Sequence, residues 1–363
     1  MFVGGEFYAD PAWRLDAPAA PRENTTFLSG GTACLTVISD FLLHHGMGKV
    51  LLPSYLCPSI VRTFERCGVG WDFYEVNEDL SIDLDDLARK ATPGGAVYFI
   101  HYFGFFHSQA TQDFLQQLRQ KDILLIEDNA QAGFPARLTG DFAFNSIRKL
   151  AGHDGGFLTT RHDLAPFLDR YRGRPNPRLP LIRAYRQGLY GYLFEHRGSH
   201  AELEQLFQRA EGIYESNPAV LGDADELEQI QRLDWEGIRQ ARRENYQYLM
   251  HWVRQIPEIS PIFPELQTDN LPMGLPVYFS GVSRDRVNEE LGKAGIGLTI
   301  HWEEIGSDPR TRGNARAVEM AGRMLTLVID QRIRRKQMDY LAEHLIRGIR
   351  TEEILHELHK LHK

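Results

Sequence analysis

The sequence predicts an α/β protein with a mostly parallel central sheet, helices on both faces of that sheet, and a small C-terminal α+β domain. Between residues 32 and 160, apolar runs of strand length alternate with amphipathic stretches of helix length, the pattern of βα units. The last third of the chain alternates strands and helices with short returns. The 363 residues suffice for two domains. We therefore expect a large domain over residues 1–222 and a second, smaller one over residues 223–363.

The expected strands of the large domain are apolar runs bounded by glycine, proline or polar residues. They are VLLP (50–53), GWDFYEV (70–76), AVYFI (96–100), ILLIE (123–127), FAFNS (142–146) and GFLTT (156–160). The helices between them are expected over residues 33–45, 58–67, 84–91 and 109–121. In such βαβ units the carboxyl ends of strands and the N-termini of helices share one edge of the sheet, where ligands bind. Motifs at these junctions are therefore candidates for the functional site.

Residues 161–220 depart from this pattern and are expected to be an insertion. The run RYRGRPNPRLPLIRAYR is rich in arginine and proline. We expect most of its arginines to form a solvated surface, and the alternative is that they receive a phosphorylated or carboxylated substrate. These arginines are Arg170, Arg172, Arg174, Arg178, Arg183 and Arg186.

A long amphipathic run over residues 224–255 predicts one extended helix that connects the two domains. The smaller domain that follows is expected to contain three strands and three helices. The strands are PVYFS (276–280), IGLTIHW (296–302) and MLTLVI (324–329), and the helices cover residues 284–294, 314–322 and 334–350. The tail TEEILHELHKLHK is expected to be a frayed amphipathic helix.

Composition limits the partners of this chain. The net charge of −8 provides no overall positive field for nucleic acid or an anionic membrane, so we expect neither as a partner. Three cysteines without a CxxC spacing predict no disulfide framework and no metal site, and favour the reducing cytoplasm. No signal peptide or membrane-spanning run is visible.

The first candidate motif is FLSGGTACL, which puts Gly31 and Thr32 at the start of the first expected helix. Free N–H groups and the helix dipole at such a start favour a phosphate group. The simpler alternative is an ordinary helix cap with a tight turn.

The second motif, ILLIEDNAQAG, ends an apolar strand in Asp128, with Gln131 three residues later. A poorly hydrated carboxylate at a strand tip stays charged only when a cation or strong donor faces it. The protonated ring nitrogen of a cofactor is such a cation, and a turn capped by Asp128 is the alternative.

The third motif, GDFAFNSIRKLAGHDGG, contains Lys149 and Ser146 between two expected strands. A lysine in a partly desolvated pocket loses its proton readily and reacts with aldehydes, whereas an isolated lysine is usually a surface residue. Together the three motifs provide an anion cradle, a carboxylate and an amine, which are the groups that pyridoxal phosphate requires.

These motifs resemble those of the DegT-type aminotransferases, fold type I pyridoxal phosphate enzymes that aminate keto sugars. The resemblance extends from about residue 4 to residue 350 and rests on five ordered motifs. They are GGTACL, VLLPSYLCPS, IHYFGF, IEDNAQA and GDFAFNSIRKLAGHDGG, and IHW and LTLVIDQR add to it.

The resemblance implies that Lys149 binds the cofactor aldehyde and moves the proton, while Asp128 pairs with the pyridinium. Gln131 would lie near the phenolic oxygen, and Gly31, Thr32 and Ser146 would hold the phosphate. The family also implies a homodimer with active sites at the subunit interface, and glutamate or glutamine as the amino donor.

The chain differs from the family at several positions. Cys57 stands where an aromatic residue often stacks on the cofactor, and Tyr55 or Tyr102 is a candidate replacement. Gly30 replaces the first serine of the phosphate motif, and Asn217 is the candidate for an asparagine donated by the partner subunit. The lysine segment is also shorter than in typical members.

His101 and His301 each precede an aromatic residue near an expected strand end and are candidates to line the substrate pocket, alongside Tyr102. Histidines satisfied by the backbone are the alternative.

The expected function is therefore amino transfer from an amino acid to a keto sugar, expected to be nucleotide-linked. A pyridoxal-dependent dehydratase is an alternative, but sugar dehydratases of the family replace the lysine with histidine. A non-catalytic binding protein of the same fold remains open. A nicotinamide-linked oxidoreductase is disfavoured because no GxGxxG follows the first strand.

Overall fold

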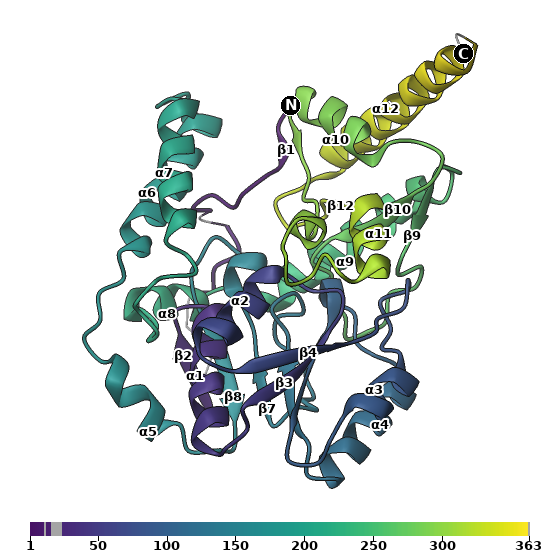
Figure 1. Cartoon of the computed structure of the whole chain (residues 1–363). Coiled ribbons are helices and arrows are strands. Elements are labelled where there is room, and N and C mark those ends of the chain that lie inside the picture. Colours follow the sequence, from purple (N-terminus) through teal and green to yellow (C-terminus); the bar gives the residue numbers. More distant parts are fainter. Residues whose placement is uncertain (11, 16–23, 362–363) are drawn as a thin grey trace.

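A seven-stranded sheet forms the centre of the larger part of the molecule (Figure 1), in a computed structural model that describes residues 1–10, 12–15 and 24–361. Its strands lie in the order β2-β8-β7-β6-β5-β3-β4. They are β2 (Thr25–Leu28), β3 (Lys49–Pro53), β4 (Gly70–Tyr74), β5 (Ala96–Ile100), β6 (Leu124–Asp128), β7 (Phe142–Phe144) and β8 (Gly156–Thr160). The five strands from β4 to β7 are parallel, and β8 is antiparallel to both of its neighbours. The predicted mostly parallel sheet is confirmed, and β2 is a further edge strand that the sequence analysis missed.

The central strands are apolar throughout because helices cover both faces of the sheet. Every residue of β5, β6 and β7 is buried, as expected for parallel strands that have no solvated face. On β8, Gly156 faces Cys34 of α1, and its neighbour Phe157 faces Ile230 and Trp235 on the opposite side. The helices of the first units are α1 (Gly31–His44), α2 (Pro58–Arg66), α3 (Leu84–Lys90) and α4 (Gln109–Gln120), each within two residues of its predicted bounds.

A second, antiparallel sheet in the order β12-β10-β9 forms the core of the C-terminal part. Its strands are β9 (Ile259–Pro261), β10 (Leu275–Phe279) and β12 (Met324–Leu327), and its helices are α10 (Arg284–Lys293), α11 (Ala315–Arg323) and α12 (Arg335–Leu361). The expected strand IGLTIHW is mostly wrong, because only β11 (Ile296–Gly297) pairs as a strand there, with β1 (Val3–Gly4). The start of the chain therefore lies against its C-terminal part, and the tail continues α12 as far as Leu361.

The single helix predicted over residues 224–255 is wrong. The chain forms α8 (Ala224–Gln231) and α9 (Trp235–Val253), because the Asp234 side chain accepts a hydrogen bond from Gly237 N at 2.9 Å and caps a new helix. The remaining helices belong to the insertion expected over residues 161–220 or are short 3-10 turns. They are α5 (Ala165–Leu168), α6 (Arg178–Glu195), α7 (His200–Gly212), η1 (Tyr102–Gly104), η2 (Ile147–Lys149), η3 (Asp169–Tyr171) and η4 (Glu303–Gly306).

Helices α6 and α7 form a hairpin that stands apart from the two sheets (Figure 1). One large apolar core extends through both sheets, a small cluster packs behind η2, and another lies between α6 and α7. Among the described residues, no helix is both long and apolar enough to span a bilayer.

Candidate active site

The three candidate motifs meet at one edge of the central sheet. Asp128 is the last residue of β6, and His101 follows β5 directly. Ser146 lies just after β7 and precedes η2, which carries Lys149. Because β5, β6 and β7 are parallel, their carboxyl ends bring these residues to the same edge, opposite the start of α1.

Asp128 is a buried carboxylate with two donors. Its side chain is 5% exposed, accepts a hydrogen bond from the Tyr98 hydroxyl, and accepts another from Ala130 N at 2.7 Å. Burial raises the pKa of Asp128 to about 6, although both donors and the positive charge of Lys149 act to lower it. Asp128 and Lys149 are thus electrostatic neighbours, and the carboxylate is available to a cationic partner.

Lys149 lies at the end of η2, beside a cavity of about 140 Å³ between the two sheets. Ile147 and Leu150, on either side of the turn, are fully buried in the cluster with Ile230 and Leu233, and this packing fixes the turn. Burial, and then the charge of Arg148, lower the pKa of the Lys149 amine. A neutral, nucleophilic amine is therefore easier to form here than on the surface.

Gln131 presents an unused donor. The residue is 3% exposed, and its Oε1 accepts a hydrogen bond from Phe103 N at 2.7 Å. Its Nε2 is buried and has no hydrogen-bond partner within the described part of the chain. A buried amide without a partner is costly, so an acceptor from a bound molecule is expected at this point.

His101 and Glu127 form a buried pair behind Asp128. His101 Nε2 lies 3.3 Å from Glu127 Oε1, and Glu127 Oε2 accepts hydrogen bonds from Thr139 N at 2.6 Å and Gly140 N at 2.8 Å. The His101 contacts and the Gly140 donor hold the pKa of Glu127 below its usual value in spite of burial. His101 Nδ1 is buried and lacks a partner among the residues described.

The start of α1 is the candidate anion cradle of the sequence analysis. Gly30 is the residue before the helix, and no side chain accepts a hydrogen bond from the first turn. The first N–H groups of α1 are therefore available to a bound anion. A Cβ on Gly31 would lie 3.5 Å from Phe144 Cε2 and 3.7 Å from Ser146 Cβ. Ser146 and the start of α1 therefore lie close together.

The three candidates for the ring-stacking position occupy different places. The Tyr55 hydroxyl donates to His301 O at 2.7 Å and so links the edge of the large sheet to the C-terminal part. The Tyr102 hydroxyl donates to Tyr55 O, which joins the ends of β5 and β3 within the large sheet. Cys57 is partly exposed, its Sγ lies 3.0 Å from Ser59 Oγ, and it acts electrostatically on Lys149.

His301 lines the same cavity as Lys149, and its Nδ1 lies 2.9 Å from Thr326 Oγ1. Burial and the charge of Lys149 lower the pKa of His301 to about 3, so this imidazole is neutral. Asn217 is apart from this cavity. It lies with Gly30 and Thr32 of its own chain, and its Nδ2 donates to Asn176 Oδ1 at 2.9 Å.

Several arginines expected to be solvated are buried. Arg178 is 2% exposed and pairs with Asp154 and Glu211, and Arg186 pairs with Asp154 at 2.8 Å. Arg183 is half-buried against Glu226. These charges are buried because each guanidinium finds a carboxylate from a remote part of the chain. Only the first three arginines of the run are exposed, namely Arg170, Arg172 and Arg174.

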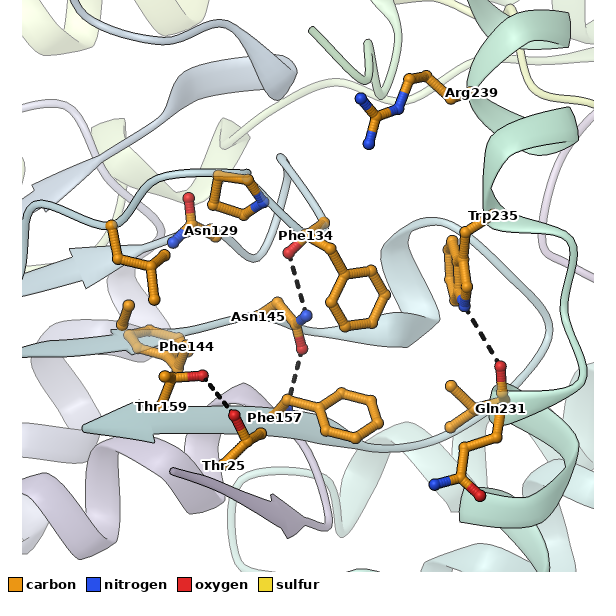
Figure 2. A pocket seen from close by; sticks show the side chains of 15 residues that line it. Thr25, Asn129, Phe134, Phe144, Asn145, Phe157, Thr159, Gln231, Trp235 and Arg239 are labelled. Carbon is orange, nitrogen blue, oxygen red and sulfur yellow. Dashed lines mark hydrogen bonds between the residues drawn. The ribbon is translucent and has the colours of Figure 1, made fainter. Parts of the chain in front are cut away.

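A further cavity of about 200 Å³ lies on the other face of β7 and β8 (Figure 2). Phe134 packs there against Phe157 and Trp235, with ring centroids 5.5 and 5.0 Å apart. Among the described residues that line it, none is a residue that the sequence assigned to the site. Across all the residues that the structure describes, no group of three or more His, Cys, Asp or Glu is arranged to hold a metal ion.

Sequence reasoning missed Tyr98, Arg148 and Tyr214. Tyr98 belongs to the predicted strand AVYFI, and its position two residues before the end of β5 places it level with Ile126 on β6. Arg148 precedes Lys149 directly, and this adjacency was a signal in the sequence. Nothing in the sequence placed Tyr214 near Thr32, because these residues are far apart along the chain.

The fold is that of solved sugar aminotransferases. Spr1654 from Streptococcus pneumoniae, solved in its PLP form, has a TM-score of 0.67 and 15% identity over 97% of this chain and 99% of that one. The aminotransferase TlmJ from Streptoalloteichus hindustanus has a TM-score of 0.65 and 18% identity, covering 91% and 86% of the two chains. DesI, solved in the presence of its TDP-sugar product, has a TM-score of 0.66 and 20% identity, covering 92% and 83%.

At these identities the similarity is one of fold, and this chain has the architecture of fold type I pyridoxal phosphate aminotransferases. No protein-family model matches the chain, and no curated protein matches it in sequence.

Proposed function

We propose that this protein is a pyridoxal phosphate-dependent aminotransferase that moves an amino group from an amino acid to a keto sugar. The observation that carries the proposal is the meeting of three groups at one sheet edge: the amine of Lys149, the carboxylate of Asp128 and the unpartnered Nε2 of Gln131. These are the groups that the aldehyde, ring nitrogen and phenolic oxygen of the cofactor require. The orphaned Gln131 amide in particular fits a bound acceptor.

When bound, the cofactor acts as an electron sink that weakens bonds to the α-carbon of an amine joined to its aldehyde. Asp128 keeps a negative charge opposite the ring nitrogen, and Tyr98 and Ala130 orient that carboxylate. Gly31, Thr32 and Ser146 hold the phosphate at the start of α1.

Lys149 is the base in this proposal. Burial and the charge of Arg148 lower the pKa of its amine, so the unprotonated amine that accepts the proton from the substrate α-carbon and returns it forms more easily than on the surface. The neutral His301 lines the cavity beside Lys149, where we expect the substrate. In this proposal the buried His101 and Tyr102 also contribute to the substrate pocket.

We propose a nucleotide-linked keto sugar as the amino acceptor. The solved proteins that share the fold support this choice, because they include DesI with its TDP-sugar product. Glutamate or glutamine as donor and a homodimer with active sites near the subunit interface belong to the same proposal. In it, residues 1–222 carry the cofactor and residues 223–363 close over the substrate.

The test is a cofactor-trapping experiment on the purified protein. Pyridoxal phosphate should give a visible absorbance band, and borohydride reduction should fix the label on Lys149, as read by peptide mass mapping. Lys149→Ala should not take the label, and its rate of amino transfer should fall at least about 10²-fold. The exposed Lys121→Ala is the matched control and should keep both.

Transfer itself is measured with glutamate or glutamine, by the keto acid released and by the keto sugars that recover the amino group. A label that persists in Lys149→Ala, or wild-type protein that takes no label, would overturn the proposal. Loss of water from a sugar without transfer of nitrogen would instead favour the dehydratase alternative.

A further inference from the structure

Tyr214, which follows α7, reaches the start of α1 from the same chain. A Cβ placed on Gly30 would lie 3.8 Å from the Tyr214 hydroxyl oxygen, and the hydroxyl is in polar contact with the Thr32 side chain. Tyr214 and Thr32 also line one small pocket. The phenol is therefore at the anion cradle, although no sequence motif indicated it.

Two arginines hold the Tyr214 ring in this position. Arg148 Cζ lies 4.2 Å from the ring centroid, and Arg178 Cζ lies 5.0 Å from it. Arg178 is buried, and its Nη2 donates to Glu211 at 2.7 Å. Cation–π contacts of this kind hold the ring, and with it the hydroxyl, in this position.

Arg148 lacks a close carboxylate of its own. Its nearest acidic contact in the described part of the chain is Glu211 at 3.6 Å, and Glu211 already accepts the shorter bond from Arg178. Arg148 Nε is buried without a partner among the described residues. The Arg148 side chain is otherwise partly exposed, so the buried Nε is a donor left for a bound anion, because an unpaired polar atom away from water is costly.

The predicted phosphate cradle contains no positively charged side chain of its own. Gly31, Thr32 and Ser146 offer backbone and hydroxyl donors but no cation, and Gly30 offers no hydroxyl. Arg148 lies two residues after Ser146 on the same turn, and Tyr214 contacts Thr32. Both additional groups thus border the cradle.

We propose that Arg148 and Tyr214 bind the phosphate of the cofactor, and that each chain thereby holds this phosphate with its own residues. The proposal rests on the proposed function, since it concerns the same cofactor. Arg148 supplies the charge-assisted hydrogen bonds that a phosphate favours, and the Tyr214 hydroxyl donates one more. Arg178 is a positioning residue, because it acts through the Tyr214 ring.

The test compares two ligands of the cofactor-free protein: pyridoxal phosphate, and pyridoxal, which has the aldehyde but no phosphate. Arg148→Met should raise the Kd for pyridoxal phosphate about tenfold or more, and Tyr214→Phe about threefold to tenfold. The Kd for pyridoxal should change by less than about twofold. Because both ligands react with Lys149, any effect of Arg148 on that amine cancels in the comparison.

The exposed substitutions Arg172→Met and Tyr192→Phe are matched controls and should leave both Kd values unchanged. Arg148→Lys, which keeps the charge, should recover part of the affinity for pyridoxal phosphate. Tyr214→Phe preserves the packing of the ring, so it tests the proposal even if Arg148→Met does not fold.

The proposal is overturned if the variants weaken both ligands equally, or if neither variant changes the Kd for pyridoxal phosphate. Failure of the proposed function looks different, since wild-type protein would then bind neither aldehyde.

Discussion

Replacing Asp128 by asparagine should stabilise the cofactor-free protein while it destroys the proposed site. Asparagine has the shape of aspartate, so its Oδ1 can still accept from Ala130 N, and its Nδ2 can donate to the Tyr98 hydroxyl. The substitution therefore removes the buried charge and keeps the contacts.

The magnitude follows from the pKa of Asp128, which burial raises from 3.8 to about 6. A group with a raised pKa in the folded protein contributes stability that is complete below pH 3.8 and is lost as the pH rises through about 6. One pKa unit is worth about 1.4 kcal/mol, so the charged carboxylate costs about 3 kcal/mol at pH 7.5. With an unfolding entropy of about 2.1 cal/mol/K per residue, this amounts to about 4 °C in Tm.

The assay is thermal unfolding of cofactor-free wild type and Asp128→Asn between pH 4 and 7.5, at one protein concentration. The gain in Tm should be about 4 °C at pH 7.5 and should shrink toward zero near pH 4, where wild-type Asp128 is protonated. Asp122→Asn, at an exposed carboxylate, is the control and should leave Tm unchanged at every pH.

An equal or lower Tm for Asp128→Asn at pH 7.5 would refute the reasoning, because it would mean that the free site already stabilises the charge. With pyridoxal phosphate present, the order should reverse, since the cofactor stabilises the wild type through the carboxylate and by mass action.

Three further substitutions test other parts of the site. Glu127→Ala should lower the free energy of unfolding by about 2–5 kcal/mol, because Thr139 N and Gly140 N lose their acceptor, and an unchanged urea midpoint would contradict the assigned contacts. Arg178→Met should cost about 3–5 kcal/mol by leaving the buried Asp154 and the partly exposed Glu211 short of a partner, whereas a cost below 1 kcal/mol would show that water compensates them. Gln131→Leu should weaken pyridoxal phosphate binding about threefold to tenfold in an absorbance titration, and unaltered binding would remove the amide from the site.

The βα units were predictable because each buried parallel strand is an apolar run and each covering helix is amphipathic. The break between α8 and α9 was not recognised, since the amphipathic period continues across Asp234, although an aspartate at this point is a helix-start signal. The isolated bridge between Arg14 and Leu233 brings the N-terminal segment to this break, and no local pattern encodes such a contact.

The sequence by itself determined which residues stand at strand ends, and parallel strands bring their carboxyl ends to one edge whatever the remaining details. Lys149, Asp128 and Ser146 could therefore be grouped from local patterns alone. Only the tertiary structure decided that Tyr214 reaches Thr32, that Arg178 is buried against Asp154, and that Gln131 Nε2 has no partner among the described residues. The physical reason is that these contacts join segments far apart in the chain, whose meeting depends on how whole elements pack rather than on the preferences of neighbouring residues.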